Sequence, residues 1–164
     1  MKFNYFAFPK IFKYGIFYIK RLKMAVPDVT INYLTVLISA VISFIIGGLW
    51  YSPILFGNAW MKFGGFNQKD IEAAKKKGMG KLYLTGFIGT LLMAFVLAHF
   101  VQYLSASTFI EGMQAGFWIW IGFIVPILIG SVLWESKPIK FYLINVLYHL
   151  VSLLIMAGIL ASWQ

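Results

Sequence analysis

The sequence predicts an all-α integral membrane protein, a bundle of four spanning helices, and three observations lead to that fold class. Of the 164 residues, 61% are hydrophobic and only 12% are charged, whereas a soluble domain carries roughly 25% charged residues. Four apolar segments each contain about 20 residues or more without Lys, Arg, Asp or Glu, enough to cross the hydrocarbon core of a bilayer. Basic residues gather between these segments, as they do in membrane proteins.

The predicted spans are residues 31–50, 82–104, 112–134 and 141–163. They are about twice as long as barrel strands. A helix also satisfies every backbone polar group within its own segment, which lipid requires. Aromatic residues mark the predicted ends and are expected to lie at the headgroup level, namely Tyr33, Trp50, Tyr51, Tyr83, Tyr103, Trp134, Tyr142 and Trp163.

The loops predict an orientation. Residues 51–81 carry six lysines and residues 135–140 carry two, whereas residues 105–111 carry no basic side chain. Because basic loops stay in the cytoplasm, we expect a multi-pass protein of the cytoplasmic (plasma) membrane, with both lysine loops inside and the C-terminus outside. The net charge of +9 could indicate nucleic-acid binding, but the basic residues flank apolar runs and form no stripe on a soluble face, so no nucleic-acid partner is expected.

Residues 1–23 form a basic, aromatic leader that precedes the four-span domain of residues 24–164. Pro9, Lys10 and Lys13 interrupt the apolar core that a signal peptide needs. One interpretation is an amphipathic anchor on the lipid surface. The other is that Met24 is the natural start and the leader is a mis-assigned upstream segment.

The loop segment 67–78 predicts a short soluble helix, capped by Asn67 and ended by Gly78. Asp70 and Glu72 lie toward its start and Lys75 to Lys77 in its last turns, which suits the helix dipole. It is expected to be a solvated loop; a contact with anionic lipid is the functional alternative.

The stretch "IIGGLWYSPILFG" closes the first span. Pro53 disfavours helix at Ser52 and helps to end the span. Trp50, Tyr51 and then Trp60 are expected to anchor at the interface. The longer stretch that contains it, "NYLTVLISAVISFIIGGLWYSPILFGNAWM", and "WESKPIKFYLINVLYHLVSLLIMAGILASW" near the C-terminus resemble the two signatures of the domain of unknown function 1761 family. The resemblance runs from about Met24 to Trp163 and implies a four-span membrane fold without implying an activity.

Spans one and three end alike, in "GGLWYSP" and "GSVLWESKP". The two helix hairpins are therefore candidates for a parallel repeat, an arrangement that frames a binding site in transporters. Chance or shared interface chemistry explains the similarity equally well.

Small residues at helical spacing predict where the spans pack closely. The stripes are Ser39, Ser43 and Gly47; Gly86, Thr90, Ala94 and Ala98; Gly112 and Gly116; and Gly122, Pro126 and Gly130. Pro126 is also expected to kink the third span.

Polar residues within the spans are the candidate ligand-binding residues. Asn145, His149 and Ser152 form a stripe on the fourth span with Tyr148 beside it, and His99 lies in the second span. Glu135, Trp134 and Trp50 are candidates for the inner mouth of a site that reaches toward this stripe. Hydrogen bonding between helices by neutral histidine is the structural alternative.

Several chemistries are not expected. The chain has no cysteine, so it has neither a disulfide framework nor a thiolate metal site. Helical rise places His99 and His149 at depths about 13 Å apart, too far for one haem, and no cofactor is predicted. No nucleophile–base pair or phosphate loop indicates an enzyme.

Two functional hypotheses remain. The first is a small polytopic protein of the lipid bilayer that binds or transports a small-molecule ligand, as a homo-oligomer. The second is an accessory or structural membrane subunit without a ligand site of its own.

Overall fold

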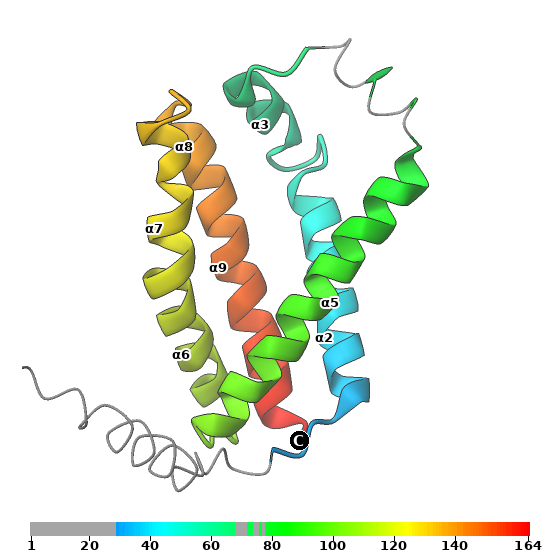
Figure 1. Ribbon diagram of the computed structural model, residues 1–164, viewed down its shortest axis with the longest axis vertical. Helices are drawn as coiled ribbons and strands as arrows, with labels where there is room; N and C mark the ends of the chain where they lie inside the picture. Colours follow the sequence, from blue (N-terminus) through cyan, green and yellow to red (C-terminus); the bar gives the residue numbers. More distant parts are fainter. Residues whose placement is uncertain (1–28, 68–71, 74–75, 77) are drawn as a thin grey trace, which may run out of the picture.

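The computed structural model describes residues 29–67, 72–73, 76 and 78–164, and all regular structure in that part of the chain is helical (Figure 1). The leader at residues 1–23 lies outside the described residues, as does much of the predicted loop helix at 67–78. The elements are α2 (Tyr33–Trp50), α3 (Gly57–Gly64), α5 (Met79–Tyr103), α6 (Phe109–Ile119), a π-helical turn η1 (Trp120–Ile124), α7 (Val125–Leu128), α8 (Gly130–Leu133) and α9 (Ile139–Ser162).

Four described helical segments are long and apolar enough to cross a membrane: Tyr33–Trp50, Met79–Tyr103, Phe109–Leu133 and Ile139–Ser162. Each begins and ends within three residues of the predicted span, so the predicted all-α, four-span architecture is confirmed. Side-chain caps define two of the starts. The Asn32 side chain accepts from the backbone of Leu34 and Thr35, and Thr108 forms a capping box with Glu111.

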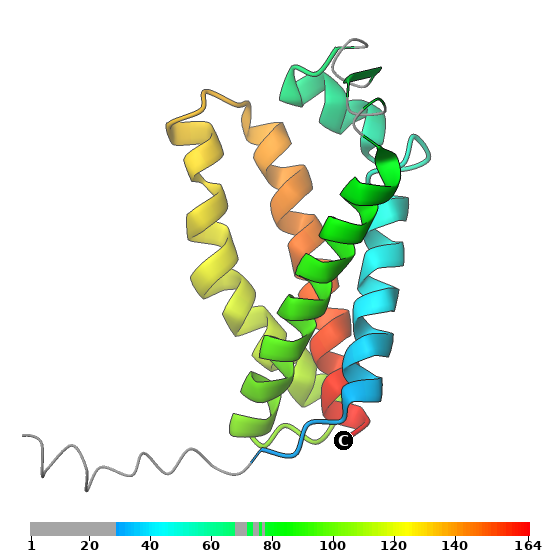
Figure 2. The same ribbon diagram turned by 45° about the vertical axis from the view of Figure 1, so that its right-hand side comes forward.

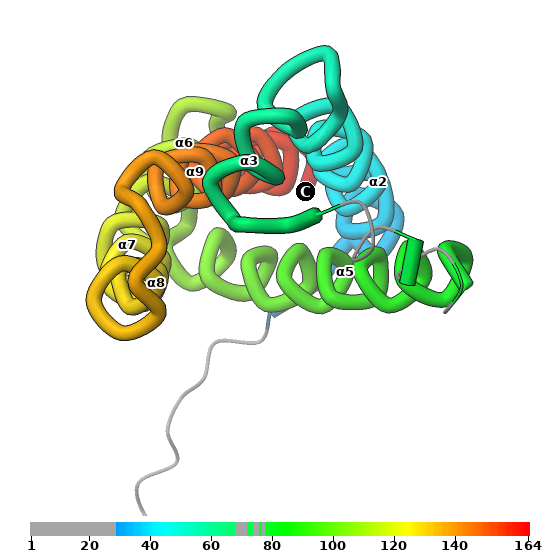
Figure 3. Tube along the Cα trace, turned by 90° about the horizontal axis from the view of Figure 1, so that it is seen from above, coloured from blue at the N-terminus to red at the C-terminus, as the bar shows by residue number. Residues whose placement is uncertain are grey.

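Successive spans run in opposite directions. The end of α2, α3, the end of α8 and the start of α9 lie at one end of the bundle, and the α5–α6 connection and the C-terminus lie at the other (Figure 1). α5 crosses the bundle obliquely. The segment α6 to α8 lies close to α5 at their connection and diverges from α5 toward the α3 end (Figure 2). Seen along the bundle, α3 lies over α9 (Figure 3).

α9 is the central helix of the bundle. It packs against α2 and α5 on one side and against α6 on the other. Gly112 and Gly116 allow the closest approach: a Cβ atom at Gly112 would stand 2.2 Å from the Ala157 carbonyl oxygen, and one at Gly116 would stand 2.6 Å from that of Leu153. The predicted Gly112–Gly116 packing stripe is therefore confirmed.

The stripe on α2 is also confirmed. Ser39 and Ser43 are fully buried, and Ser43 shares a 2.5 Å hydrogen bond with Ser152 of α9. On α5, Ala94 and Ala98 are buried as predicted.

The prediction of a packing stripe at Gly122, Pro126 and Gly130 is wrong for a single copy of the chain. A Cβ atom at Gly122 would meet nothing within 4 Å, and Pro126 is exposed. Tyr142, in the first turn of α9, has a buried ring, and its hydroxyl donates to the Val125 carbonyl.

The third span is irregular around Pro126. The α-helix gives way to the π-helical turn η1, resumes as α7 with the proline in its first turn, and breaks again at Ile129. Proline lacks the N–H that an α-helix uses there. The predicted kink is thus a region of altered hydrogen bonding that extends from Trp120 to Ile129.

Candidate functional site

Asn145 is the centre of a polar cluster that joins three elements. Its side-chain Oδ1 accepts from the Tyr51 hydroxyl at 2.9 Å and from the Trp60 Nε1 at 3.1 Å. Its Nδ2 donates to the Phe141 carbonyl, one turn earlier on α9, at 2.8 Å. An indole nitrogen can only donate, so Trp60 identifies the oxygen side of the amide. The Asn145 amide therefore clamps the end of α2 and α3 to α9.

The turn after α2 brings Trp60 to this position. The Gly57 N–H donates to the Ser52 carbonyl at 2.9 Å, which closes the loop around Pro53 and starts α3. A Cβ atom at Gly57 would lie 2.3 Å from the Tyr51 carbonyl oxygen. Only glycine fits this approach of backbone to backbone.

The prediction that Trp50, Tyr51 and Trp60 anchor at the interface stays a prediction, and the structure adds the direction of their side chains. α2 ends at Trp50 as predicted, and the three side chains turn toward α9 and are half-buried. The Trp50 Nε1 donates to the Ile144 carbonyl at 3.1 Å. Each aromatic side chain has a polar partner on α9, so the three rings pack against the bundle.

We call Trp50, Tyr51, Trp60, Asn145 and Tyr148 the aromatic–asparagine cluster. Its rings contact one another: the Tyr51 and Tyr148 centroids lie 5.1 Å apart, edge to face, and those of Tyr51 and Trp60 lie 5.6 Å apart. Burial first, and the neighbouring Tyr148 second, raise the pKa of Tyr51 above its ordinary range. The phenol therefore stays protonated and remains a donor to Asn145.

A groove of about 370 Å³ lies beside the cluster, between α2, α5 and α9. We call it the phenolic groove, because three of its residues are tyrosines. Its lining residues are Phe44, Gly47, Gly48, Tyr51, Tyr83, Gly86, Thr90 and Tyr148. Every polar side chain in this lining is a neutral hydroxyl. The groove can therefore offer hydroxyl groups and ring faces to a ligand.

Gly47 sets the shape of this groove. A Cβ atom at Gly47 would stand 2.8 Å from the Tyr148 hydroxyl oxygen, so the absence of a side chain lets the phenol lie against α2. A Cβ atom at Gly48 would meet nothing within 4 Å. One glycine thus seats Tyr148, and the next leaves the groove open.

The predicted stripe on α9 divides between separate environments. Asn145 belongs to the cluster, and Tyr148 belongs to both the cluster and the groove. Ser152 lies apart from both, because its hydroxyl forms the buried hydrogen bond with Ser43. His149 packs beside Tyr148, and its Nδ1 is buried without a hydrogen-bond partner among the described residues. His99 lies apart, with its Nδ1 bonded to the Phe95 carbonyl on its own helix at 2.9 Å.

Trp134 and Glu135 are not brought to the cluster. Trp134 is 83% exposed and Glu135 is exposed, at the end of α8. The two similar motifs therefore have different environments, since Trp50 points into the bundle and Trp134 points out. Lys137, two residues further on, does face inward: its Nζ donates to the Gly64 carbonyl at 2.6 Å and lies 5.9 Å from the Phe66 ring centre.

Several residues of this region are not among the predicted site residues. Tyr51 and Trp60 are predicted as anchors, and no binding role is predicted for Phe44, Tyr83 or Thr90. The available signal was the density of aromatic residues and glycines around the first loop, without any indication of their direction. Among the described residues, no group of three or more His, Asp or Glu side chains is placed to hold a metal ion.

The fold and this site define a helical, multi-pass membrane protein with a neutral aromatic groove near one end of the bundle. The profile of a family described as "Protein of unknown function (DUF1761)" matches residues 34–161. The chain belongs to this family, as the two motifs predicted. Searches of curated proteins and of solved structures find no significant match.

Proposed function

We propose that this protein binds a small polar or cationic solute in the phenolic groove and carries it through the cytoplasmic membrane. The observation that supports the proposal is the groove itself. Its volume of about 370 Å³ is in the range of small-molecule sites, roughly 300–1,000 Å³. Its polar groups are few and come from three different helices, which is typical of a site that orients a ligand.

The aromatic–asparagine cluster holds one wall of the groove in place. Tyr51 is fixed by its bond to Asn145, and Tyr148 is seated against Gly47. Side chains held in this way lose little freedom when a ligand arrives. A fixed wall is therefore consistent with a binding site.

The chemistry favours a cation or a neutral polar group over an anion. Tyrosine ring faces attract cations. Gly47 and Gly48 lie in the last turn of α2, where the helix dipole also favours positive charge. α5 presents its opposite end at this level, but the dipole effect is confined to the first turn, and Tyr83, Gly86 and Thr90 lie beyond it.

A substitution that fills the groove tests this proposal. Gly48→Leu places a side chain in the groove where the backbone leaves space, and Gly122→Leu is the matched control, because Gly122 also has open space and does not line the groove. Native mass spectrometry of gently extracted protein reports a retained small molecule. We expect that molecule in the wild type and in Gly122→Leu, and its loss in Gly48→Leu. A bare wild-type protein, or equal retention in both variants, would overturn the proposal.

The second candidate function is that of an accessory or structural membrane subunit without a ligand site of its own, which can also assemble as a homo-oligomer. The third span supports this role, because only 6% of an 18-residue apolar stretch of that span is buried, compared with 39% for α9. Its exposed surface is therefore available for contact with another protein. The same mass spectra test this candidate. An oligomer that carries no small molecule, and that Gly122→Leu dissociates, would favour the subunit role over solute binding.

A further inference from the structure

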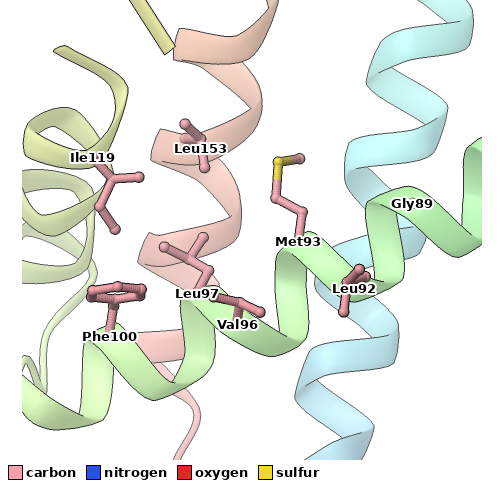
Figure 4. Close-up of a pocket in the computed structure, with 8 residues that line it drawn as sticks. All are labelled: Gly89, Leu92, Met93, Val96, Leu97, Phe100, Ile119 and Leu153. Carbon is pink, nitrogen blue, oxygen red and sulfur yellow. The ribbon is translucent and has the colours of Figure 1, made fainter. Parts of the chain in front are cut away.

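A second cavity lies on the other side of α5, away from the phenolic groove. It has a volume of about 320 Å³. Six residues of α5 line it: Gly89, Leu92, Met93, Val96, Leu97 and Phe100. Ile119 of α6 and Leu153 of α9 form the facing wall (Figure 4). We propose that this cavity, the acyl slot, binds one hydrocarbon chain of a membrane lipid.

The slot is long, and its length matches one leaflet. Its α5 residues recur at helical spacing from Gly89 to Phe100. At a rise of 1.5 Å per residue this stripe is about 16 Å long. The hydrocarbon core of a bilayer is about 30 Å thick, so one leaflet is about half of that. The stripe runs from the middle of α5 toward its C-terminal end, as a chain from that leaflet would.

The chemistry of the slot excludes most other occupants. All eight lining side chains are apolar or absent, and all eight residues belong to segments that can span the membrane. A cavity of about 150 Å³ with such a lining stays dry and accepts apolar molecules. The acyl slot has about twice that volume, so its walls would forgo a large dispersion attraction if nothing filled it.

The slot is continuous with the surface that faces lipid. Leu97 and Leu153 are buried in its floor, whereas Leu92, Val96 and Phe100 are 62%, 45% and 44% exposed. Met93 and Leu97 project from α5 toward Leu153, and Phe100 lies beside Ile119 (Figure 4). A chain can therefore enter sideways from the bilayer, and a compact solute would leave much of the slot unfilled.

The headgroup of such a lipid would lie at the α5–α6 connection. Residues 101–111 contain no Lys or Arg. The slot therefore selects the chain by shape and does not recruit the headgroup by positive charge. A phosphatidylcholine is accordingly a suitable probe, and the inference does not depend on the phenolic groove.

Photolabelling tests the acyl slot. The full chain is placed in phosphatidylcholine nanodiscs that contain a phosphatidylcholine with a diazirine in its acyl chain, and labelled peptides are quantified by mass spectrometry. We expect labelling within 89–100 and at Leu153 to exceed labelling around Ile127, which is 71% exposed on α7 and does not line the slot.

Two matched variants provide the control. Val96→Trp covers the slot from its edge, and Ile88→Trp adds the same ring at a 56% exposed position of α5 that does not line it. We expect Val96→Trp to lose the excess labelling and Ile88→Trp to keep it. Equal labelling of slot and lipid-facing peptides in the wild type would overturn the proposal.

A third outcome would show a different occupant. If the slot peptides stay unlabelled and crosslink to a second copy of the chain, the cavity is an interface between copies and the proposal fails. Circular dichroism melts of both variants show whether each is folded. If Val96→Trp is unfolded, Met93→Trp fills the slot from its partly buried side and replaces it.

Discussion

The Tyr51 phenol donates a 2.9 Å hydrogen bond to the Asn145 side-chain oxygen across 94 residues of sequence. This bond connects the end of the first span to the first half of the fourth. The same oxygen also accepts from the Trp60 indole, so one amide holds two aromatic side chains. Any change at Asn145 therefore acts on the α2 end, on α3 and on the wall of the phenolic groove together.

Asn145→Leu should destabilise the protein and loosen α3. The leucine has a similar size but accepts no hydrogen bond, so Tyr51 and Trp60 both lose their partner. An unsatisfied buried donor costs about 1–3 kcal/mol, and bonds within membranes average less, roughly 0.6 kcal/mol. We expect a loss of about 2 kcal/mol in the free energy of unfolding in mixed micelles. Asn58→Leu, at an exposed position of α3, is the control. A variant as stable as that control would refute the clamp.

Gly112→Ala and Gly122→Ala should differ strongly although both add one methyl group to the third span. At Gly112 the methyl would overlap the Ala157 backbone, so α6 and α9 must separate. Overpacking of this kind costs roughly 1–3 kcal/mol or more. At Gly122 the methyl enters open space, and we expect little change. Thermal unfolding of the two purified variants measures the contrast, and similar melting temperatures would contradict the described packing.

The Ser43–Ser152 bond should appear as a coupling between α2 and α9. Both residues are fully buried, so Ser43→Ala or Ser152→Ala leaves a hydroxyl without its partner. The double alanine variant leaves none. In a double-mutant cycle we expect a coupling energy of about 1 kcal/mol. If the two single losses simply add, the hydroxyls do not bond.

The stability of the protein should fall in alkali, in part through Tyr51. Because burial raises the pKa of the folded-state phenol, the folded chain holds a proton that the unfolded chain releases above pH about 10. The contribution of this phenol is thus complete below that pH and is lost as the pH rises beyond it. Between pH 8 and 11, Tyr51→Phe should lose stability less steeply than the wild type. Parallel curves would show that the phenol is not shielded.

Cysteine labelling should reveal the orientation in the membrane. The chain has no native cysteine, so a single introduced residue reports its own side. With both lysine loops in the cytoplasm, Ser107→Cys should react with an impermeant maleimide added to intact cells, and Ala74→Cys should react only after lysis. The reverse pattern would invert the proposed orientation and place the acyl slot in the inner leaflet.

The spans were predictable because hydropathy and length determine them almost alone. A run such as Ile31–Trp50 leaves a helix as the only way to satisfy its backbone in lipid. The tight packing at Gly112 and Gly116 was predictable for a similar reason, since small residues four apart mark close helix contacts. Gly122 has the same local pattern, yet a Cβ atom there would meet nothing within 4 Å, while its neighbours Trp120 and Ile124 pack against the core. Which face of the third span turns toward α9 is a tertiary property.

The site was harder to predict, because an aromatic residue at the end of a span can face either way. Trp50 and Trp134 end almost identical motifs, and only their partners distinguish them: the Ile144 carbonyl is available to Trp50, whereas Trp134 is 83% exposed. Asn145 and Tyr148 were singled out as polar residues within a span. The loop that places Trp60 beside Asn145 depends on the turn at Gly57. Hydrophobic periodicity in the sequence does not predict that turn.

The π-helical turn at Trp120–Ile124 has a consequence for length variation in this family. Such a turn holds one residue more than the α-helix that flanks it, and the extra residue is accommodated within the turn. Deleting one residue there would restore regular α-helix and leave the segment from Val125 to Trp134 facing the same way. Relatives one residue shorter at this point would therefore keep the four spans, the tight Gly112 contact and the same outer face. The turn is thus an indel site at which a family can vary its length without changing its fold or its packing.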